Sequence, residues 1–217
     1  MTDLRAASGN RGDRRKARTR GALIDAAVSL IANGRGEQAS IQEITETADV
    51  GFGSFYNHFE SKDELFRTAS EQLLERWGQT IDAACEGLTD PAEIFAASFR
   101  ISGRLGWTNE PMARFLIGSG LGVIDARFGL APRARRDIEA GQASGRFTIV
   151  NADVALAASA GALLGVLRLR LAHQPDLRVE AVDDAAAAVL RLLGVAAGEA
   201  ENLVARPLPH VETPLSD

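Results

Sequence analysis

Two capped helix starts, close together in the chain, constrain its fold more than any other feature of the sequence. Ser40-Ile-Gln-Glu43 and Ser61-Lys-Asp-Glu64 each place a serine hydroxyl three residues before a glutamate, which is the capping box that begins a helix. Between them, Asp49-Val50-Gly51 interrupts the pattern. Residues 40–62 are therefore predicted to form a short helix, a turn of about three residues, a second short helix over Phe52–His58, and the start of a long helix.

Two short helices joined by so tight a turn cannot bury their apolar faces alone, so a third helix must support them. The segment from Arg14 to about Asn33 supplies one, because its alanine, leucine and isoleucine residues recur at helical spacing and two glycines follow it. This is a helix-turn-helix arrangement. In such arrangements the second helix enters the major groove of DNA and the first crosses the backbone.

The rest of the chain is also predicted to be helical. Helix starts recur at Asp90-Pro91, at Asn109-Glu110-Pro111 and at Asn151-Ala-Asp153, and alternation of β-branched residues is scarce. An amphipathic stretch follows Asp125, and two helices rich in alanine, leucine and valine follow over about 154–173 and 178–195. The sequence predicts an all-α fold.

The net charge of −5 hides an asymmetry between the two ends of the chain. Residues 1–20 hold seven Arg or Lys against two Asp, whereas the remainder holds 17 basic and 27 acidic residues. Because an acidic body is repelled by phosphate, any contact with DNA must be confined to a patch near the N-terminus. The run Arg11–Arg20 is either a solvated charge cluster or an arm that contacts the DNA backbone or minor groove.

Several classes of protein are not expected. The only cysteine, Cys85, allows no internal disulfide, and it is interpreted as a small buried apolar residue, with a redox sensor as the alternative. The three histidines lie far apart, so no metal and no cofactor is expected. No secretory signal and no long uncharged apolar run is apparent, so we expect a cytoplasmic protein with no membrane partner.

The aromatic positions, the caps and the turn together resemble a known family. Val50-Gly-Phe-Gly-Ser-Phe-Tyr-Asn-His-Phe59 followed by Ser61-Lys-Asp-Glu-Leu-Phe66 is similar to the signature of the TetR family of bacterial transcriptional repressors. The resemblance covers about residues 14–66. It implies an N-terminal three-helix helix-turn-helix DNA-binding domain and a larger C-terminal helical domain for ligand binding and dimerisation. The expected divisions are a disordered basic arm (1–13), the DNA-binding domain (14–66), the ligand-binding and dimerisation domain (67–197) and a flexible tail (198–217).

Residue chemistry and the resemblance indicate the same DNA-binding residues. Gly53 allows close approach of the backbone, and Phe52 and Asn57 suit a thymine methyl and an adenine edge. The residues expected at phosphate are Ser40, Ser54, Tyr56, His58 and Lys62. For Tyr56 the alternative is surface packing, and for His58 a structural hydrogen bond. The sequence departs from the pattern at two positions. Many family members carry Gly at the position of Asp49, and Ser or Thr at the position of Gly51.

The body of the chain offers candidates for two further roles. Aromatic and apolar residues between 95 and 128 suit a pocket for a small apolar or amphipathic ligand, although core packing explains them equally well. The candidates are Phe99, Arg104, Trp107, Met112, Phe115 and Leu116. The glycines over 118–122 indicate either a broken helix or a deformable pocket wall.

Two apolar stripes in the last helices pack either internally or across a two-fold axis, and the resemblance implies a four-helix dimer interface. The stripe residues are Ala157, Gly161, Gly165, Val182, Ala186 and Val189. The leading hypothesis is therefore a non-enzymatic homodimeric repressor that binds a palindromic double-stranded DNA operator and is released by a small molecule. The alternatives are a helical small-molecule-binding protein or enzyme without a DNA role, and a DNA-binding protein whose body has a protein partner or a structural core instead of a ligand. Activation instead of repression is also open, since the sign depends on where the operator lies.

Overall fold

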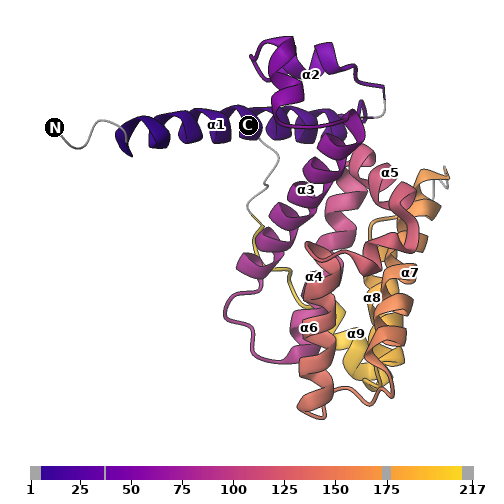
Figure 1. Ribbon diagram of the computed structural model, residues 1–217. Coiled ribbons are helices and arrows are strands. Elements are labelled where there is room, and N and C mark those ends of the chain that lie inside the picture. The colour runs from indigo at the N-terminus through magenta and orange to yellow at the C-terminus, as the bar shows by residue number, and fades with distance from the viewer. Residues whose placement is uncertain (1–5, 37, 173–176, 212–217) are drawn as a thin grey trace. The chain divides into compact units, whose positions relative to one another are not determined.

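The structure is a computed structural model that describes residues 6–36, 38–172 and 177–211 (Figure 1). All regular structure in these ranges is helical, which confirms the all-α prediction. The chain divides into two compact units, Met1–Gln72 and Leu73–Asp217. The division falls within helix α3 (Lys62–Ala84), so that this helix contributes to both units.

The first unit contains α1 (Ala6–Ala32), α2 (Ile41–Thr47), a 3-10 helix η1 (Phe52–Asn57) and the start of α3. Its core consists of side chains that are almost completely buried from all four elements. These include Leu23, Ala27, Ile44, Phe55, Phe59 and Leu65. The segment predicted as the second short helix thus forms a single tight helical piece between the turn and α3.

Both predicted capping boxes begin helices. The Ser40 Oγ accepts a hydrogen bond of 3.1 Å from the Glu43 N–H, and the Ser61 Oγ accepts one of 3.2 Å from the Glu64 N–H. The Glu64 carboxylate in turn accepts from the Glu60 N–H at 2.8 Å. These bonds satisfy N–H groups that have no partner within the helix, and so fix where α2 and α3 begin.

Helix α1 begins earlier than predicted, because residues 6–13 are helical in the structure and not disordered. Residues 1–5 of the expected arm lie outside the described residues. Residues 6–13 are not strong helix formers, since Ser, Gly, Asn and Asp make up five of the eight. The physical reason is that they extend a helix already formed by Arg14–Arg20 and anchored from Leu23 onward, and extension costs less than nucleation.

The second unit contains the rest of α3 and the remaining helices. These are α4 (Pro91–Thr108), α5 (Glu110–Ser119), η2 (Gly120–Asp125), α6 (Leu130–Ala143), α7 (Ala152–Leu171), α8 (Ala181–Leu192) and α9 (Ala197–Ala205). The predicted N-caps are confirmed, since Asp90, Asn109 and Asn151 each accept a hydrogen bond from a backbone N–H in the first turn. Phe95, Phe99, Ile138, Phe147 and Leu190 lie in its core.

Two stretches of this unit differ from the sequence prediction. The amphipathic stretch after Asp125 becomes helical as α6 only at Leu130. Gly129 has a φ of 84°, which is incompatible with a right-handed α-helix, so the helix cannot begin before it. Residues 198–205, predicted to lie in a flexible tail, belong to α9 (Ala197–Ala205), which packs against α8 and buries Ala200 and Leu203. Residues 212–217 of that tail lie outside the described residues.

Helix α7 is long and apolar enough, by length and composition, to cross a membrane, which the sequence analysis did not anticipate. The central helix of a water-soluble helical unit meets the same criteria. In the structure α7 packs against α4, α5, α6 and α8. Only 28% of its most apolar window is buried, however, so an apolar side of α7 remains uncovered.

Candidate DNA-reading surface and ligand pocket

The turn between α2 and η1 is built by the last residues of α2. Asp49 has a φ of 52°, in the left-handed region, and its N–H donates to the Glu46 carbonyl at 3.1 Å. The Val50 N–H donates to the Thr45 carbonyl at 3.0 Å. This pair of bonds is a Schellman motif, in which the left-handed position favours glycine. The geometry explains why the family often has Gly where this chain has Asp49.

The predicted DNA-binding residues gather around this turn. Phe52 and Tyr56 are 54% and 58% exposed although both are large and apolar. Ser40, Gly53 and Asn57 are also exposed, whereas Ser54, His58 and Lys62 are half-buried. The Tyr56 ring lies edge-on to Phe55, with ring centroids 5.2 Å apart, so its position is fixed by packing while its hydroxyl end remains available.

Gly53 is not required by the packing of the first unit. A Cβ added there meets no atom within 4 Å, and its φ does not lie in the left-handed region. The fold would therefore accept an alanine at this position. The absence of a side chain leaves the backbone of η1 open to close approach from outside.

Lys62 and His58 are positioned by neighbouring groups of the same unit. The Lys62 Nζ donates to the Ala39 carbonyl at 3.2 Å and lies 5.9 Å from the centroid of the Phe66 ring. The His58 Nδ1 is buried and has no hydrogen-bond partner among the described residues. Burial, followed by the charges of Lys16 and Arg20, holds the pKa of His58 below its ordinary value of 6.5, so the ring is neutral at pH 7.

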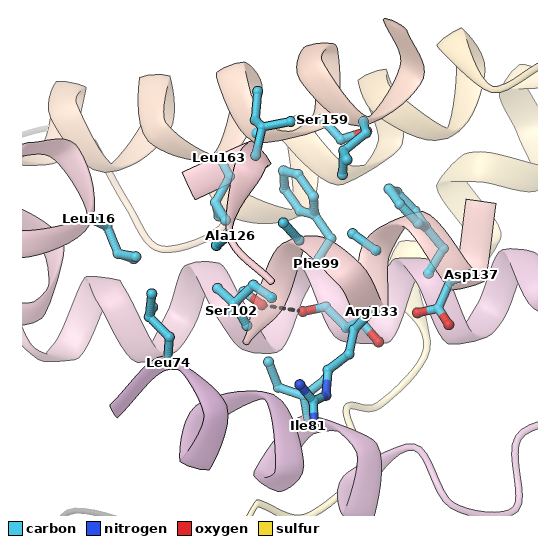
Figure 2. A pocket seen from close by; sticks show the side chains of 18 of the residues that line it. Leu74, Ile81, Phe99, Ser102, Leu116, Ala126, Arg133, Asp137, Ser159 and Leu163 are labelled. Carbon is cyan, nitrogen blue, oxygen red and sulfur yellow. Dashed lines mark hydrogen bonds between the residues drawn. The ribbon is translucent and has the colours of Figure 1, made fainter. Parts of the chain in front are cut away.

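A cavity of about 90 Å³ lies in the second unit, between the α3 portion of that unit, α4, α5, η2, α6 and α7 (Figure 2). Most of its wall is apolar. The apolar side chains include Leu74, Ile81, Phe95, Phe99, Leu116, Phe128, Leu156 and Leu163. A cavity of this shape suits a small, largely apolar molecule with few polar groups.

The polar part of the wall comes from three charged side chains and three serines. The charged residues are Asp82, Arg133 and Asp137, and the serines lie at 98, 102 and 159. The hydroxyls of Ser102 and Ser159 donate to backbone carbonyls one turn earlier, each at 2.7 Å. Their oxygens therefore remain as acceptors for a donor within the cavity.

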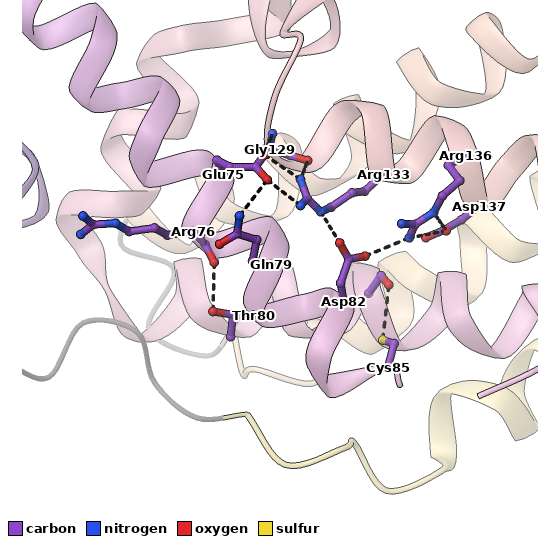
Figure 3. Close-up of polar contacts among 11 residues, drawn as sticks. Glu75, Arg76, Gln79, Thr80, Asp82, Cys85, Gly129, Arg133, Arg136 and Asp137 are labelled. Carbon is purple, nitrogen blue, oxygen red and sulfur yellow. Dashed lines mark hydrogen bonds and ion pairs between the residues drawn. The ribbon is translucent and has the colours of Figure 1, made fainter. Parts of the chain in front are cut away.

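Arg133 is the centre of an ion-pair network behind this wall (Figure 3). Its guanidinium donates to both Glu75 oxygens, at 2.8 and 2.9 Å, and to Asp82 at 2.6 Å. Arg136 donates to Asp82 at 3.0 Å and to Asp137 at 2.9 Å. Three carboxylates thus face two guanidinium groups, which leaves the network with one net negative charge when all are ionised.

The network shifts two carboxyl pKa values in opposite directions. Hydrogen bonding to Arg133 lowers the pKa of Glu75 to about 2. Burial raises the pKa of Asp137 above its ordinary value, and the hydrogen bond from Arg136 only partly offsets that effect. Asp137 is 6% exposed.

Of the six residues predicted for a ligand, the structure places Phe99 and Leu116 in the cavity wall. The other four, Arg104, Trp107, Met112 and Phe115, are not part of that wall. Arg104 donates to Asp183 at 2.7 Å, and Arg170 lies over the Trp107 ring. Met112 is buried and Phe115 is half-buried.

The charged cavity residues were missed by the sequence analysis. Asp82 lies about fifty residues before Arg133, and nothing in the sequence signals that α3 and α6 pack together. The spacing of Arg133 and Asp137, four residues apart on an amphipathic helix, was the one available signal that they share a face. Cys85 is 8% exposed, with its Sγ 3.5 Å from the Ser98 Oγ, and burial raises the pKa of its thiol.

On α8, the predicted stripe residues Val182, Ala186 and Val189 are buried inside the protomer, which favours internal packing over a dimer contact for these three residues. A Cβ added to Gly103 of α4 would lie 2.4 Å from Val182, which shows how closely these helices pack. On α7 the outcome differs. Ala157 is half-buried, and Gly161 and Gly165 are exposed with no atom in the direction of an added Cβ.

Comparison with known proteins places the chain in a family. Residues 23–69 match the profile described as bacterial regulatory proteins, tetR family, and residues 90–206 match that of the tetracyclin repressor-like C-terminal domain. The chain belongs to the TetR family. The N-terminal match includes the whole of α2, the turn and η1. The C-terminal match covers more than half of the chain and contains most of the cavity wall.

Among TetR-family structures, the chain is similar to RolR in complex with resorcinol. The two are 35% identical, with a TM-score of 0.76, over 92% of this chain and 99% of that chain. RolR without ligand is also 35% identical, with a TM-score of 0.73, over 88% and 100%. The repressor KstR2 of Mycobacterium tuberculosis is 31% identical over 37% of this chain. That match spans 42% of the length of KstR2.

Proposed function

We propose that this TetR-family chain is a cytoplasmic, ligand-responsive transcriptional repressor that binds a palindromic operator as a homodimer. The observation that carries the proposal is the exposure of Phe52, Tyr56 and Asn57 on a helical piece held by a tight turn. Large aromatic side chains are rarely left in water without a partner. An aromatic ring and an amide beside an open glycine backbone suit the edge of a DNA major groove.

Within this surface, we assign two roles. Phe52 and Asn57 contact base edges, which gives sequence preference. Ser40, Ser54, Tyr56, His58 and Lys62 contact phosphates, which sets position and most of the affinity. The Ser40 oxygen accepts from its own helix, and its O–H remains able to donate to a phosphate oxygen.

Gly53→Ala tests this surface, because the fold accepts the added methyl group. We expect unchanged or slightly higher thermal stability and at least tenfold weaker binding to the operator, since the methyl group keeps the backbone from the phosphate. Binding is measured by fluorescence anisotropy on DNA from the promoter of the protein's own gene, against a scrambled duplex, at several salt concentrations. Gly198→Ala is the matched control, since Gly198 is exposed and equally open on α9.

Asn57→Ala is the companion variant and should reduce the preference for operator over scrambled duplex. If the native protein binds both duplexes equally and weakly, and Gly53→Ala changes nothing, the DNA-binding role fails. The helical small-molecule-binding protein without a DNA role would then be favoured.

For the effector, we propose a small neutral aromatic molecule that carries hydroxyl groups. The cavity supplies an apolar wall for a ring, and acceptor oxygens from Asp82, Asp137 and the serines. Its ionic network has a net negative charge, which disfavours a carboxylate ligand. RolR, which is 35% identical over almost its whole length, binds resorcinol, a compound of this class.

A ligand that binds only the folded protein raises its unfolding free energy by about 2.7 kcal/mol at one hundred times its dissociation constant. We expect resorcinol to raise the melting temperature and to release the protein from the operator, and benzoate to do neither. Asp137→Asn should weaken both effects, whereas Asp153→Asn, at an exposed carboxylate on α7, should not. Equal responses to resorcinol and benzoate would exclude the proposed selectivity.

A further inference from the structure

The N-terminal half of α1 is a basic helix to which the proposed function assigns no role. Arg14, Arg15, Lys16, Arg18 and Arg20 are all exposed, and Asp13 is the one acidic residue between positions 12 and 20. The buried residues of α1 begin only at Leu23. The segment therefore extends beyond the packed part of its own unit, as the indigo end of α1 in Figure 1 shows.

This basic helix lies next to the proposed DNA-reading surface, which consists of the predicted DNA-binding residues Ser40, Phe52, Gly53, Ser54, Tyr56, Asn57, His58 and Lys62. The Arg20 guanidinium carbon lies 4.9 Å from the centroid of the Phe59 ring, directly after His58 in the chain. After burial, the charges of Lys16 and Arg20 are the next causes that lower the pKa of His58. Positive charge therefore begins beside the reading surface and continues along α1 through Arg18, Arg15 and Arg14, in a chain whose remainder is acidic.

We propose that residues 6–20 of α1 form a rigid basic helix that binds the phosphate backbone of the DNA flanking the operator, without reading its sequence. The proposal rests on the proposed operator binding and adds a second DNA contact to it. Fifteen helical residues span about 22 Å, which is about six base-pair steps of duplex. Charge complementarity identifies the partner as duplex DNA, because guanidinium groups on a helix pair with phosphate oxygens.

The helical state distinguishes this contact from a flexible arm in the minor groove. An extended arm follows the narrow groove and responds to A·T content, because its side chains read groove width. A helix is too wide for the minor groove and contacts phosphates on its rim. The affinity it adds should therefore depend on the presence of flanking DNA and on salt, and not on flanking sequence.

The test compares duplexes that end at the operator edge with duplexes extended by about ten base pairs on each side. Two extended duplexes carry different flanks, one rich in A·T and one rich in G·C. We expect the native protein to bind both extended duplexes about tenfold or more tightly than the short one. Replacing Arg14, Arg15 and Arg18 together by glutamine should abolish this gain and lower the salt slope by roughly 2–3 per protomer.

Two further variants make the test specific. The first is a control in which three exposed arginines of the second unit, Arg114, Arg127 and Arg178, are changed together to glutamine. It removes the same charge and should still bind the extended duplexes more tightly than the short one. Ala17→Pro keeps every charge and lets the helix restart at residue 17, where proline is tolerated, but uncouples residues 6–16 from it. We expect Ala17→Pro to lose most of the increase in affinity that flanking DNA gives the native protein.

The outcomes separate this proposal from operator binding itself. If the native protein prefers operator to scrambled duplex but gains nothing from flanks, the basic helix has no DNA role and the proposal is overturned. A gain that survives Ala17→Pro, or that appears only with A·T-rich flanks, also overturns it in favour of a flexible arm. Absence of any preference for operator DNA would instead contradict the proposed function.

Discussion

At the residue scale, Asp49 is one of two positions, with Gly51, where this chain departs from the family pattern, and its backbone conformation makes the departure unfavourable. Its φ of 52° lies in the left-handed region, which disfavours residues with a Cβ and which aspartate tolerates better than most. Its carboxylate is exposed at the turn that leads into η1. The same residue therefore carries a conformational cost and a negative charge close to the proposed DNA contact.

We predict that Asp49→Gly raises the unfolding free energy by up to about 1 kcal/mol, because glycine adopts this backbone conformation without strain. It should also tighten operator binding several-fold, since a charge repelled by phosphate is removed. Asp49→Asn separates the two effects, because asparagine also tolerates the left-handed region but has no charge. Urea denaturation and anisotropy titration measure the two changes. An Asn variant that binds no more tightly than the native chain would contradict the electrostatic part.

At the element scale, the contact between α3 and α6 depends on Arg133, which joins Glu75 and Asp82 across the two helices. The same side chain lines the cavity. Breaking a partly buried ion pair leaves an unpaired charge, so the packing of α3 on α6 is sensitive to the protonation of these carboxylates.

Glu75→Gln tests this element contact through pH. The pKa of Glu75 is about 2 in the folded chain, below its ordinary value of 4.5, so the ion pair is fully stabilising above pH 4.5. That stabilisation should be lost as the pH falls from 4.5 towards 2, because protonation removes the charge that Arg133 faces. Glu75→Gln should lower stability at pH 7 and flatten this part of the acid-denaturation curve.

The control for this variant is Glu71→Gln, one turn earlier on α3, where the side chain is 49% exposed and lies 3.8 Å from Arg67. An exposed pair of this kind contributes little. Thermal melts between pH 2 and 7 measure both variants. Equal acid sensitivity of the native chain and Glu75→Gln would show that other groups cause the acid transition.

At the scale of the whole molecule, the proposed repressor requires two copies of the chain, because one short reading helix contacts too few base pairs for specificity. The structure leaves an apolar surface on α7, where Val154 and Leu169 are 65% and 46% exposed on either side of two open glycines. A helix face with small residues at its centre lets a second helix approach closely.

We predict that Gly161→Leu converts the protein to monomers and weakens operator binding at least a hundredfold. An added Cβ meets no atom of its own protomer within 4 Å and the position is exposed, so helix content by circular dichroism should be unchanged. Sedimentation velocity measures the oligomeric state. Gly198→Leu on α9 is the control, since that glycine is equally open. A Gly161→Leu variant that remained dimeric would show that the interface lies elsewhere.

Local sequence determined the helix starts and the reading surface. Ser40, Ser61, Asp90, Asn109 and Asn151 each accept a hydrogen bond from a backbone N–H within three residues, so their effect is encoded over a few neighbouring positions. The turn and η1 lie within a continuous stretch of fewer than twenty residues. The capping boxes and the short spacing between them therefore specified the helix-turn-helix, and with it the position of Phe52, Tyr56 and Asn57 on η1.

Tertiary packing alone decided the cavity wall and the burial of the last helices. Asp82, Arg133 and Asp137 meet because α3 and α6 pack together. Asp82 and Arg133 are about fifty residues apart in the sequence, so no local sequence pattern predicts their contact. Val182 and Gly161 look alike in sequence, since each belongs to an apolar stripe with helical spacing. Val182 is buried against α4 whereas Gly161 is exposed, because a stripe shows that a face is apolar but not which neighbour covers it.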